Sequence, residues 1–243
     1  MLVKSGAVNA VPSVDEGTSI CDFDPEEKSH KYTIEATLVH FDHAGKRFQV
    51  LDTPGYPDFI GQTIGALRGV ENAGIVVSAQ AGIEVNTRRV FEEAGKAGVG
   101  RFIVISKMAA DNIDFPSLVE SIREMWGSRC VLLNVPLGHG QHFRGVASTL
   151  HVPEKAEGAL LDPAAIREAL IESIIEVDEG VMERYLEGQP PTPQELSRLM
   201  IQAIAQGNLI PMLCCSTKLD IGVTELLDAM AASCLSPADL PRR

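Results

Sequence analysis

The sequence has few basic residues for its length. It carries 21 lysines and arginines against 33 aspartates and glutamates, which leaves a formal net charge of −12. Since phosphate groups are bound by clustered lysine and arginine, we expect no direct grip on nucleic acid from this acidic domain alone. The sequence also lacks an apolar run of membrane-spanning length and opens without a signal peptide. These absences predict a cytoplasmic protein with no membrane partner.

Cysteine patterns typical of metal sites and disulfide frameworks are also missing. The five cysteines are odd in number, and none stand in C-x-x-C spacing. Cys214 and Cys215 lie side by side in an apolar run, which favours buried thiols over zinc ligands or disulfides. His139 and His142 have no carboxylate or cysteine close by in the sequence, so we expect exposed loop histidines there.

What the sequence does contain is an alternation of apolar strands and periodic helices. At 243 residues, 45% of them hydrophobic, the chain can form one large domain or two small ones around a buried core. After a polar, irregular stretch at 7–32, we expect strands at 32–41, 47–51, 74–78, 101–106 and 209–214, and helices at 60–70, 87–97, 115–126, 163–177, 181–186, 192–207 and 223–234. This order predicts an α/β fold with a doubly wound, mostly parallel sheet and one antiparallel edge hairpin. Ligands on such sheets bind beyond the carboxyl ends of the strands.

One loop stands out where the predicted hairpin ends. Asp52-Thr53-Pro54-Gly55 follows the strand at 47–51 and precedes a helix. Asp52 offers a hard oxygen ligand for magnesium, and Gly55 lets a backbone amide approach a terminal phosphate. The same residues also suit a plain turn between strand and helix. On the residues of this loop alone, the two interpretations stay near even.

Four landmarks in order connect this loop to a known family. They are a long loop ending at Thr33, then Asp52 to Gly55, Ser106-Lys107-Met108-Ala109 and Cys215-Ser216-Thr217-Lys218. Together with 24–28, 178–188 and 210–214, they resemble the GTP-binding domain of translational GTPases, most closely bacterial elongation factor G. The resemblance covers nearly the whole chain and implies a P-loop-GTPase-type fold. It implies an incomplete G domain at 1–134 and 209–236, an inserted α/β subdomain at 135–208 and a linker at 237–243.

The resemblance also implies roles for single residues. Thr33 matches the switch I threonine that joins Mg2+, and Asp52 matches the switch II aspartate at the same ion. Gly55 matches the glycine whose amide meets the γ-phosphate, so phosphate and metal would hold both loops until hydrolysis. Tyr56 stands at the catalytic position. The implied nucleotide-binding residues are Thr33, Asp52, Thr53, Pro54, Gly55, Ser106, Lys107, Ser216 and Thr217.

One departure from the family pattern concerns the phosphates. No Gly-x-x-x-x-Gly-Lys-Ser/Thr, the loop that wraps the α- and β-phosphates, occurs in the sequence. Residues 1–6 resemble the tail of the helix that follows this loop, ended by Gly6, and the first strand of the family's sheet is missing as well. Either the chain is a fragment of a longer protein or the loop is genuinely absent.

Two further departures concern the base and the catalytic residue. Ala109 replaces the aspartate that reads the guanine ring, and Asp111 lies two residues further on at a spacing that makes it a weak substitute. Tyr56 replaces the usual histidine. A tyrosine can position water by hydrogen bonding, but it is a poor general base near neutral pH.

The implied function is Mg2+-assisted hydrolysis of GTP to GDP and phosphate on the ribosome, in the service of translocation or recycling. Without the phosphate-wrapping loop, these 243 residues are expected to bind GTP weakly or not at all by themselves. The alternative is a non-hydrolysing remnant or truncated paralogue, which Ser106, Ala109 and the missing loop favour. A third interpretation is a related ribosomal-protection or release factor that shares this G domain.

Overall fold

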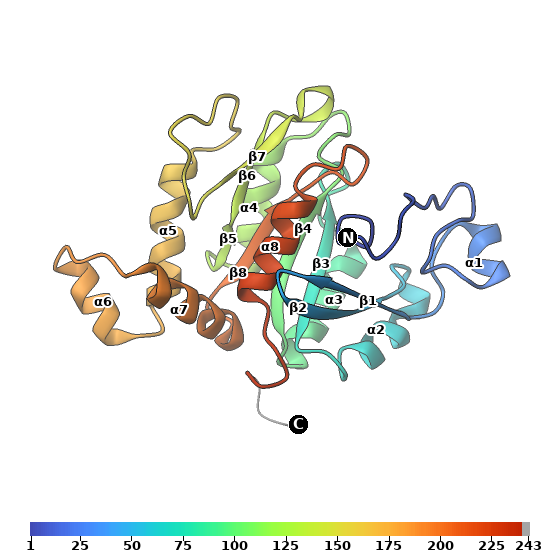
Figure 1. Cartoon of the computed structure of the whole chain (residues 1–243), viewed down its shortest axis with the longest axis horizontal. Helices are drawn as coiled ribbons and strands as arrows, with labels where there is room; N and C mark the ends of the chain where they lie inside the picture. Colours follow the sequence, from blue (N-terminus) through green and yellow to red (C-terminus); the bar gives the residue numbers. More distant parts are fainter. Residues whose placement is uncertain (240–243) are drawn as a thin grey trace.

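The computed structural model describes residues 1–239, and its centre is a four-stranded sheet in the order β3-β4-β8-β5 (Figure 1). The strands are β3 (Asn72–Ser78), β4 (Gly100–Ser106), β8 (Ile210–Cys214) and β5 (Cys130–Leu132). Each pair of neighbours in this sheet is parallel. Parallel neighbours need a crossover connection, and helices supply it here. The predicted α/β fold with a mostly parallel sheet is therefore confirmed.

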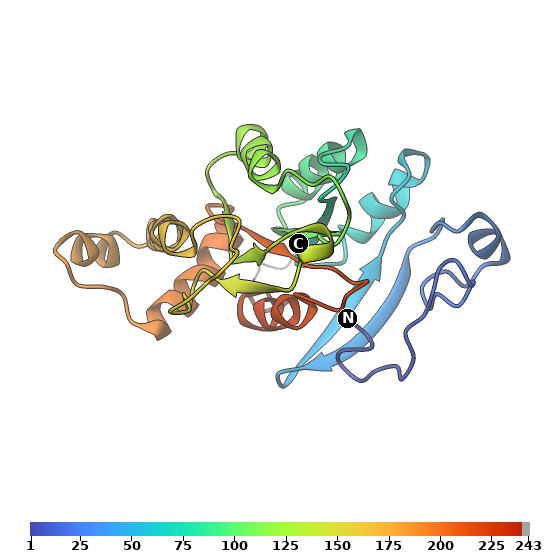
Figure 2. The same cartoon turned by 90° about the horizontal axis from the view of Figure 1, so that it is seen from above.

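Helices cover both faces of the sheet, as Figure 2 shows from above. On one face, α3 (Val85–Lys96) and α4 (Phe115–Trp126) share a buried cluster with Ile103 and Ile105 of β4. On the other face, α8 (Val223–Ser233) shares a cluster with Val104 of the same strand. Successive side chains of a strand point to opposite faces. Burial on both faces thus explains the unbroken apolar run in β4.

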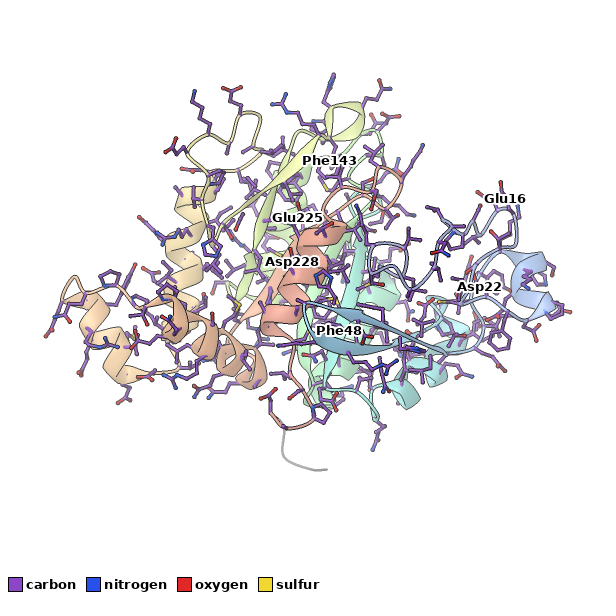
Figure 3. All side chains as sticks on the ribbon, in the orientation of Figure 1. Glu16, Asp22, Phe48, Phe143, Glu225 and Asp228 are labelled. Atoms are coloured by element: carbon purple, nitrogen blue, oxygen red, sulfur yellow. The ribbon has the colours of Figure 1, made fainter. Side chains whose placement is uncertain are left out.

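The antiparallel hairpin stands beside the central sheet and does not pair with it. β1 (Thr37–His43) and β2 (Lys46–Asp52) form a two-stranded sheet of their own. Phe41 packs into the cluster under α8, and His43 Nε2 lies 2.7 Å from Asp228 Oδ1 on that helix. Figure 3 labels Asp228 on α8 and Phe48 on β2. The side chains of the hairpin, and not its backbone, therefore attach it to the rest of the fold.

Residues 134–206 extend the molecule on the side of β5. They contain an antiparallel pair and three helices: β6 (Asn134–Leu137), β7 (Gly145–Ser148), α5 (Pro163–Ile175), α6 (Glu179–Leu186) and α7 (Pro193–Gln206). Thr192 and Glu195 form the capping box predicted for the start of α7. Buried residues of α5 and α7 belong to the same cluster as those of β4 and β5. The division into a G domain and a subdomain at 135–208 stays a prediction.

The first part of the chain differs from expectation in two places. A short helix, α1 (Pro25–His30), lies inside the stretch expected to be irregular, and its start carries a capping box of Asp24 and Glu27. Residues 1–6, predicted to be the end of a helix, form successive turns, although Gly6 does have a positive φ of 75°. The Ala7 amide donates to the Leu2 carbonyl at 2.9 Å and the Gly6 amide to the Val3 carbonyl at 3.1 Å, the pattern with which a glycine ends a helix. The predicted helix end is therefore present as a cap, without a regular helix.

Several smaller expectations concern exposure. Cys214 and Cys215 are buried, and His139 and His142 are exposed around the short helix η2 (Gly140–His142), as predicted. Within residues 1–239, no helix combines the length and apolar character needed to cross a membrane. Of the predicted linker at 237–243, residues 240–243 lie outside the described residues.

Candidate functional site

The loop that follows Asp52 leads into η1 (Pro57–Phe59) and α2 (Ile60–Ala66). Asn86, at the start of α3, donates from Nδ2 to the carbonyl oxygen of Gly55 at 2.7 Å. Because α3 follows the carboxyl end of β3, this contact holds the loop at the edge of the sheet where α/β folds bind ligands. A Cβ added at Gly55 would meet no heavy atom within 4 Å, so open space lies beside this backbone.

Asp52 lies against the segment that leads into α1. The Cys21 thiol lies near its carboxylate, and the next residue, Asp22, accepts the Thr33 hydroxyl at 2.7 Å. Part of Asp52 faces solvent, yet the pKa of its carboxyl is raised, first by desolvation and then by the negative charge of Asp22. Thr33 and Asp52, the two predicted magnesium ligands, thus lie next to two consecutive residues, Asp22 and Cys21.

A buried carboxylate holds the residues around Thr33 in place. The Glu27 side chain accepts the backbone amides of Asp24, Ile34 and Glu35 at 3.0, 2.9 and 3.1 Å. Burial by itself would raise the pKa of this carboxyl, but the backbone hydrogen bonds outweigh it and the pKa is lowered. Glu27 was not among the predicted site residues. The capping-box pattern from Asp24 to Glu27 was the one signal in the sequence that pointed to it.

Aromatic rings join the loop at Thr33 to the loop at Gly55. The centroid of Tyr32 lies 4.8 Å from that of Tyr56 and 6.2 Å from that of Phe59. Tyr56 nevertheless remains 52% exposed. Its phenol is therefore free to contact water or a ligand at the loop.

The remaining predicted residues gather at the carboxyl ends of β4 and β8. The Met108 amide donates to the Cys215 carbonyl at 3.3 Å, which brings Ser106-Lys107 next to Ser216-Thr217. Lys107 is exposed in a left-handed conformation with a φ of 60°. Ser216 is buried, and its Oγ accepts the Leu219 amide at 3.3 Å. These loops form a second group of predicted site residues.

The segment between β3 and α3 contacts both groups. Gln80 Nε2 donates to the Asp111 carbonyl at 3.4 Å, close to Lys107 in the chain, while Asn86 donates to Gly55. No hydrogen bond or ion pair within residues 1–239 joins the two groups directly. The structure therefore brings Thr33 and Asp52 together in one place and the predicted base-contacting loops together in another, with the 79–86 segment next to each.

The oxygen donors of Thr33 and Asp52 suit Mg2+ by their chemistry. This ion is usually held by one or two protein ligands, and waters and phosphate oxygens complete its shell. The negative charges of Asp52 and Asp22 act on each other, so a cation between them would be stabilised. In the part of the chain that the structure describes, no three His, Cys, Asp or Glu side chains form a metal site by themselves. The residues thus fit a cation that binds together with a phosphate group.

The sequence of this chain is similar to those of known proteins over nearly its whole length. The family model described as "Elongation factor Tu GTP binding domain" matches residues 1–235. Elongation factor G of Thermotoga neapolitana is 30% identical over an alignment of 256 residues, which covers 99% of this chain and 37% of the relative. Elongation factor G of Thermotoga maritima shows the same identity and coverage. The chain therefore spans 37% of the length of these curated relatives.

A solved structure is similar over nearly the whole chain. It is described as the crystal structure of ttk003000868 from Thermus thermophilus, and it matches with a TM-score of 0.88 and 32% sequence identity. The match covers 98% of this chain and 38% of that one.

Proposed function

This chain belongs to the elongation factor Tu GTP-binding domain family, and we propose that it is the nucleotide-binding part of an elongation factor G-like protein that hydrolyses GTP on the ribosome. The observation that carries the proposal is the position of the Asp52–Gly55 loop beside the Thr33 segment at the carboxyl edge of a parallel sheet. In this proposal, 1–134 and 209–236 form the G domain, 135–208 form the inserted subdomain, and the protein works in the cytoplasm.

Phosphoryl transfer needs positioning and charge neutralisation more than covalent chemistry. In the proposed mechanism the Gly55 amide donates to the γ-phosphate from the open side of the loop. Thr33 and Asp52 would hold Mg2+, which would neutralise phosphate charge when bound. The exposed phenol of Tyr56 orients the attacking water. Loss of the γ-phosphate then frees the loops at Thr33 and Gly55.

We propose that the base and ribose of the nucleotide bind to the second group of residues, at the carboxyl ends of β4 and β8. The Lys107 side chain is exposed and free to pack its aliphatic stem over a base. The Met108–Cys215 hydrogen bond places Ser216 and Thr217 next to Ser106 and Lys107. The Ser216 amide already donates to the Ile221 carbonyl at 2.8 Å, so the Thr217 amide is the donor proposed to meet the base.

A second candidate function is a domain that keeps this fold but has lost turnover. Ala109 favours it, because alanine offers no acceptor to the guanine ring. The contacts that bring Thr33 and Asp52 together favour the enzyme, since a domain without nucleotide has no need of them.

Calorimetric titration with GTP and ATP in the presence of Mg2+ separates the two candidates. We expect GTP to bind this chain with a dissociation constant between about 10 μM and 1 mM, because the phosphate-wrapping loop is missing from the sequence. Asp52→Asn should weaken that binding in Mg2+ and change little in EDTA, whereas Asp58→Asn in exposed η1 serves as the control. Absence of binding at about 5 mM nucleotide supports the domain without turnover. A sub-micromolar constant contradicts the expectation of weak binding.

The hydrolytic step is tested on ribosomes. Phosphate release from GTP is measured for the protein with and without ribosomes, and again with Tyr56→Phe. We expect ribosomes to accelerate release and Tyr56→Phe to lower the rate, because phenylalanine lacks the hydroxyl that orients water. Equal rates with and without ribosomes speak against a translational GTPase.

A further inference from the structure

Asn86 contacts the loop at Gly55 but belongs to no motif in the sequence. It is the second residue of α3, and its Nδ2 donates to the Gly55 carbonyl at 2.7 Å. The other end of the same side-chain amide, Oδ1, is buried. Within residues 1–239 it is the one buried side-chain oxygen or nitrogen without a hydrogen-bond partner. A buried acceptor left unpaired costs free energy, so Asn86 is only half satisfied in this arrangement.

The carbonyl that Asn86 holds belongs to the peptide unit between Gly55 and Tyr56. In a planar trans peptide the carbonyl and the amide point in opposite directions, so the Tyr56 amide points away from α3. Neither the Gly55 amide nor the Tyr56 amide donates to another described residue. Open space also lies beside Gly55. Two consecutive backbone donors therefore lack a partner, and the Tyr56 amide lies on the side of the loop that faces away from Asn86.

Asn86 makes this contact from a well-anchored helix. Phe91 of α3 is buried and stacks on Trp126 of α4, with ring centroids 4.1 Å apart. The other side chain that contacts the loop's carbonyls is Thr63 of α2, whose Oγ1 lies 3.5 Å from the Pro54 oxygen, at the limit for a hydrogen bond. Asn86 thus provides the shorter of the two contacts.

We propose that Asn86 is a positioning residue for Gly55 and Tyr56, a latch that fixes the peptide between them and thereby orients the free Tyr56 amide and the Tyr56 ring. This inference rests on the proposed function of the loop as a phosphate sensor and deepens it. The unpaired Oδ1 offsets much of what the hydrogen bond to Gly55 contributes, so the latch is weak on balance. A weak latch suits a switch, because a loop held by a small free energy is released when its phosphate contact is lost.

The test measures backbone motion by 15N relaxation on the whole chain without nucleotide. Asn86→Leu has a similar shape and removes both the donor and the unpaired acceptor. We expect the order parameters of Gly55 and Tyr56 to fall from about 0.85 to below about 0.6, with little change in Tm. Thr87→Val, on the same turn of α3, is the matched control and should leave both values unchanged.

Asn86→Asp separates the latch from a plain role in starting the helix. An acidic residue in the first turn favours a helix, so a role confined to α3 predicts an unchanged or higher Tm and an unchanged loop. The latch predicts a freed loop at neutral pH, since a carboxylate has no hydrogen to donate to the Gly55 carbonyl. Unchanged order parameters in both Asn86 variants overturn the latch.

The relaxation measurement does not depend on nucleotide binding, so the two proposals fail separately. If the chain binds no nucleotide but both variants free the loop, the latch stands and the proposed GTPase function falls. If GTP binds and neither variant frees the loop, the proposed function stands and the latch falls.

Discussion

The ring of Tyr32 lies against the ring of Tyr56, with centroids 4.8 Å apart. Tyr32 directly precedes Thr33, whose hydroxyl is bound by Asp22, and Tyr56 directly follows Gly55. The two loops that we propose to sense a phosphate are therefore in side-chain contact. Movement of one loop changes the environment of the other.

This contact predicts a measurable coupling between the two rings. In a double-mutant cycle of Tyr32→Ala and Tyr56→Ala, we expect a coupling free energy of about 0.5–1.5 kcal/mol, the usual range for an aromatic pair. Urea unfolding of the four proteins measures it. Tyr185→Ala combined with Tyr56→Ala is the control and should be additive within about 0.5 kcal/mol. Additivity in the Tyr32–Tyr56 cycle would show that the contact carries no energy.

We predict that the ionisation of Glu27 makes the stability of the fold depend on pH. The pKa of its carboxyl is lowered in the folded chain, so its contribution is fully present above the unfolded pKa of about 4.5 and is lost as the pH falls through the folded pKa. Glu27→Gln should lower the free energy of unfolding at pH 7 by about 1–3 kcal/mol, because the backbone amides lose a charged acceptor. The difference from the unaltered chain should shrink below pH 4.5.

The control for this prediction is Glu26→Gln. Glu26 lies on the same helix but is exposed, so its substitution should change stability by no more than about 0.5 kcal/mol. Urea unfolding between pH 7 and pH 4 checks both variants. A constant difference between Glu27→Gln and the unaltered chain over this range contradicts the role given to the Glu27 charge.

We predict that a substitution at Gly55 affects GTP binding without lowering the stability of the fold. Gly55→Ala should leave the fold intact or stabilise it by up to about 1 kcal/mol, because the added Cβ meets no heavy atom within 4 Å and the backbone is not in the left-handed region. The methyl group would occupy the space that a phosphate needs, so GTP affinity should fall about tenfold or more. Gly65→Ala in α2 also meets open space and serves as the control. Equal GTP affinity in both variants would show that no phosphate approaches Gly55.

Ala109 predicts a gain of nucleotide selectivity. Ala109→Asp supplies the acceptor that the family uses to read guanine, and one such contact is worth about 1–3 kcal/mol. The ratio of ATP to GTP dissociation constants should rise by about 5- to 150-fold. Ala110→Asp adds the same charge one residue away and should leave the ratio unchanged. An unchanged ratio in Ala109→Asp would show that the base does not bind at this loop.

Most of the regular structure was predictable because it follows from local patterns. The expected helix at 115–126 matches α4 residue for residue, and the capping box at Thr192 starts α7 where predicted. The position of Asp52 at the end of a strand also followed from alternation and turn residues. Patterns of this kind depend on neighbours in the chain, and side-chain periodicity reports them directly.

Contacts between distant parts of the chain were not predictable in the same way. Asn86 and Gly55 occupy no common motif, and neither do Tyr32 and Tyr56. The spacing from Asp24 to Glu27 indicates a capping box, but it does not show that the Glu27 carboxylate also bonds to the amides of Ile34 and Glu35. Such residues are recognised only when their partners are known.

The sequence by itself determined most helices, three of the four strands of the central sheet and the edge where the Asp52–Gly55 loop lies, because periodicity and parallel topology leave few alternatives. The short elements α1, β5, β6 and β7 were not predicted. Only the tertiary structure decided that the hairpin attaches through Phe41 and His43 to α8 and not through backbone pairing with β3. It also decided which side chains hold the loop. These contacts depend on how side chains from separate elements pack in three dimensions, and no period in the sequence encodes that packing.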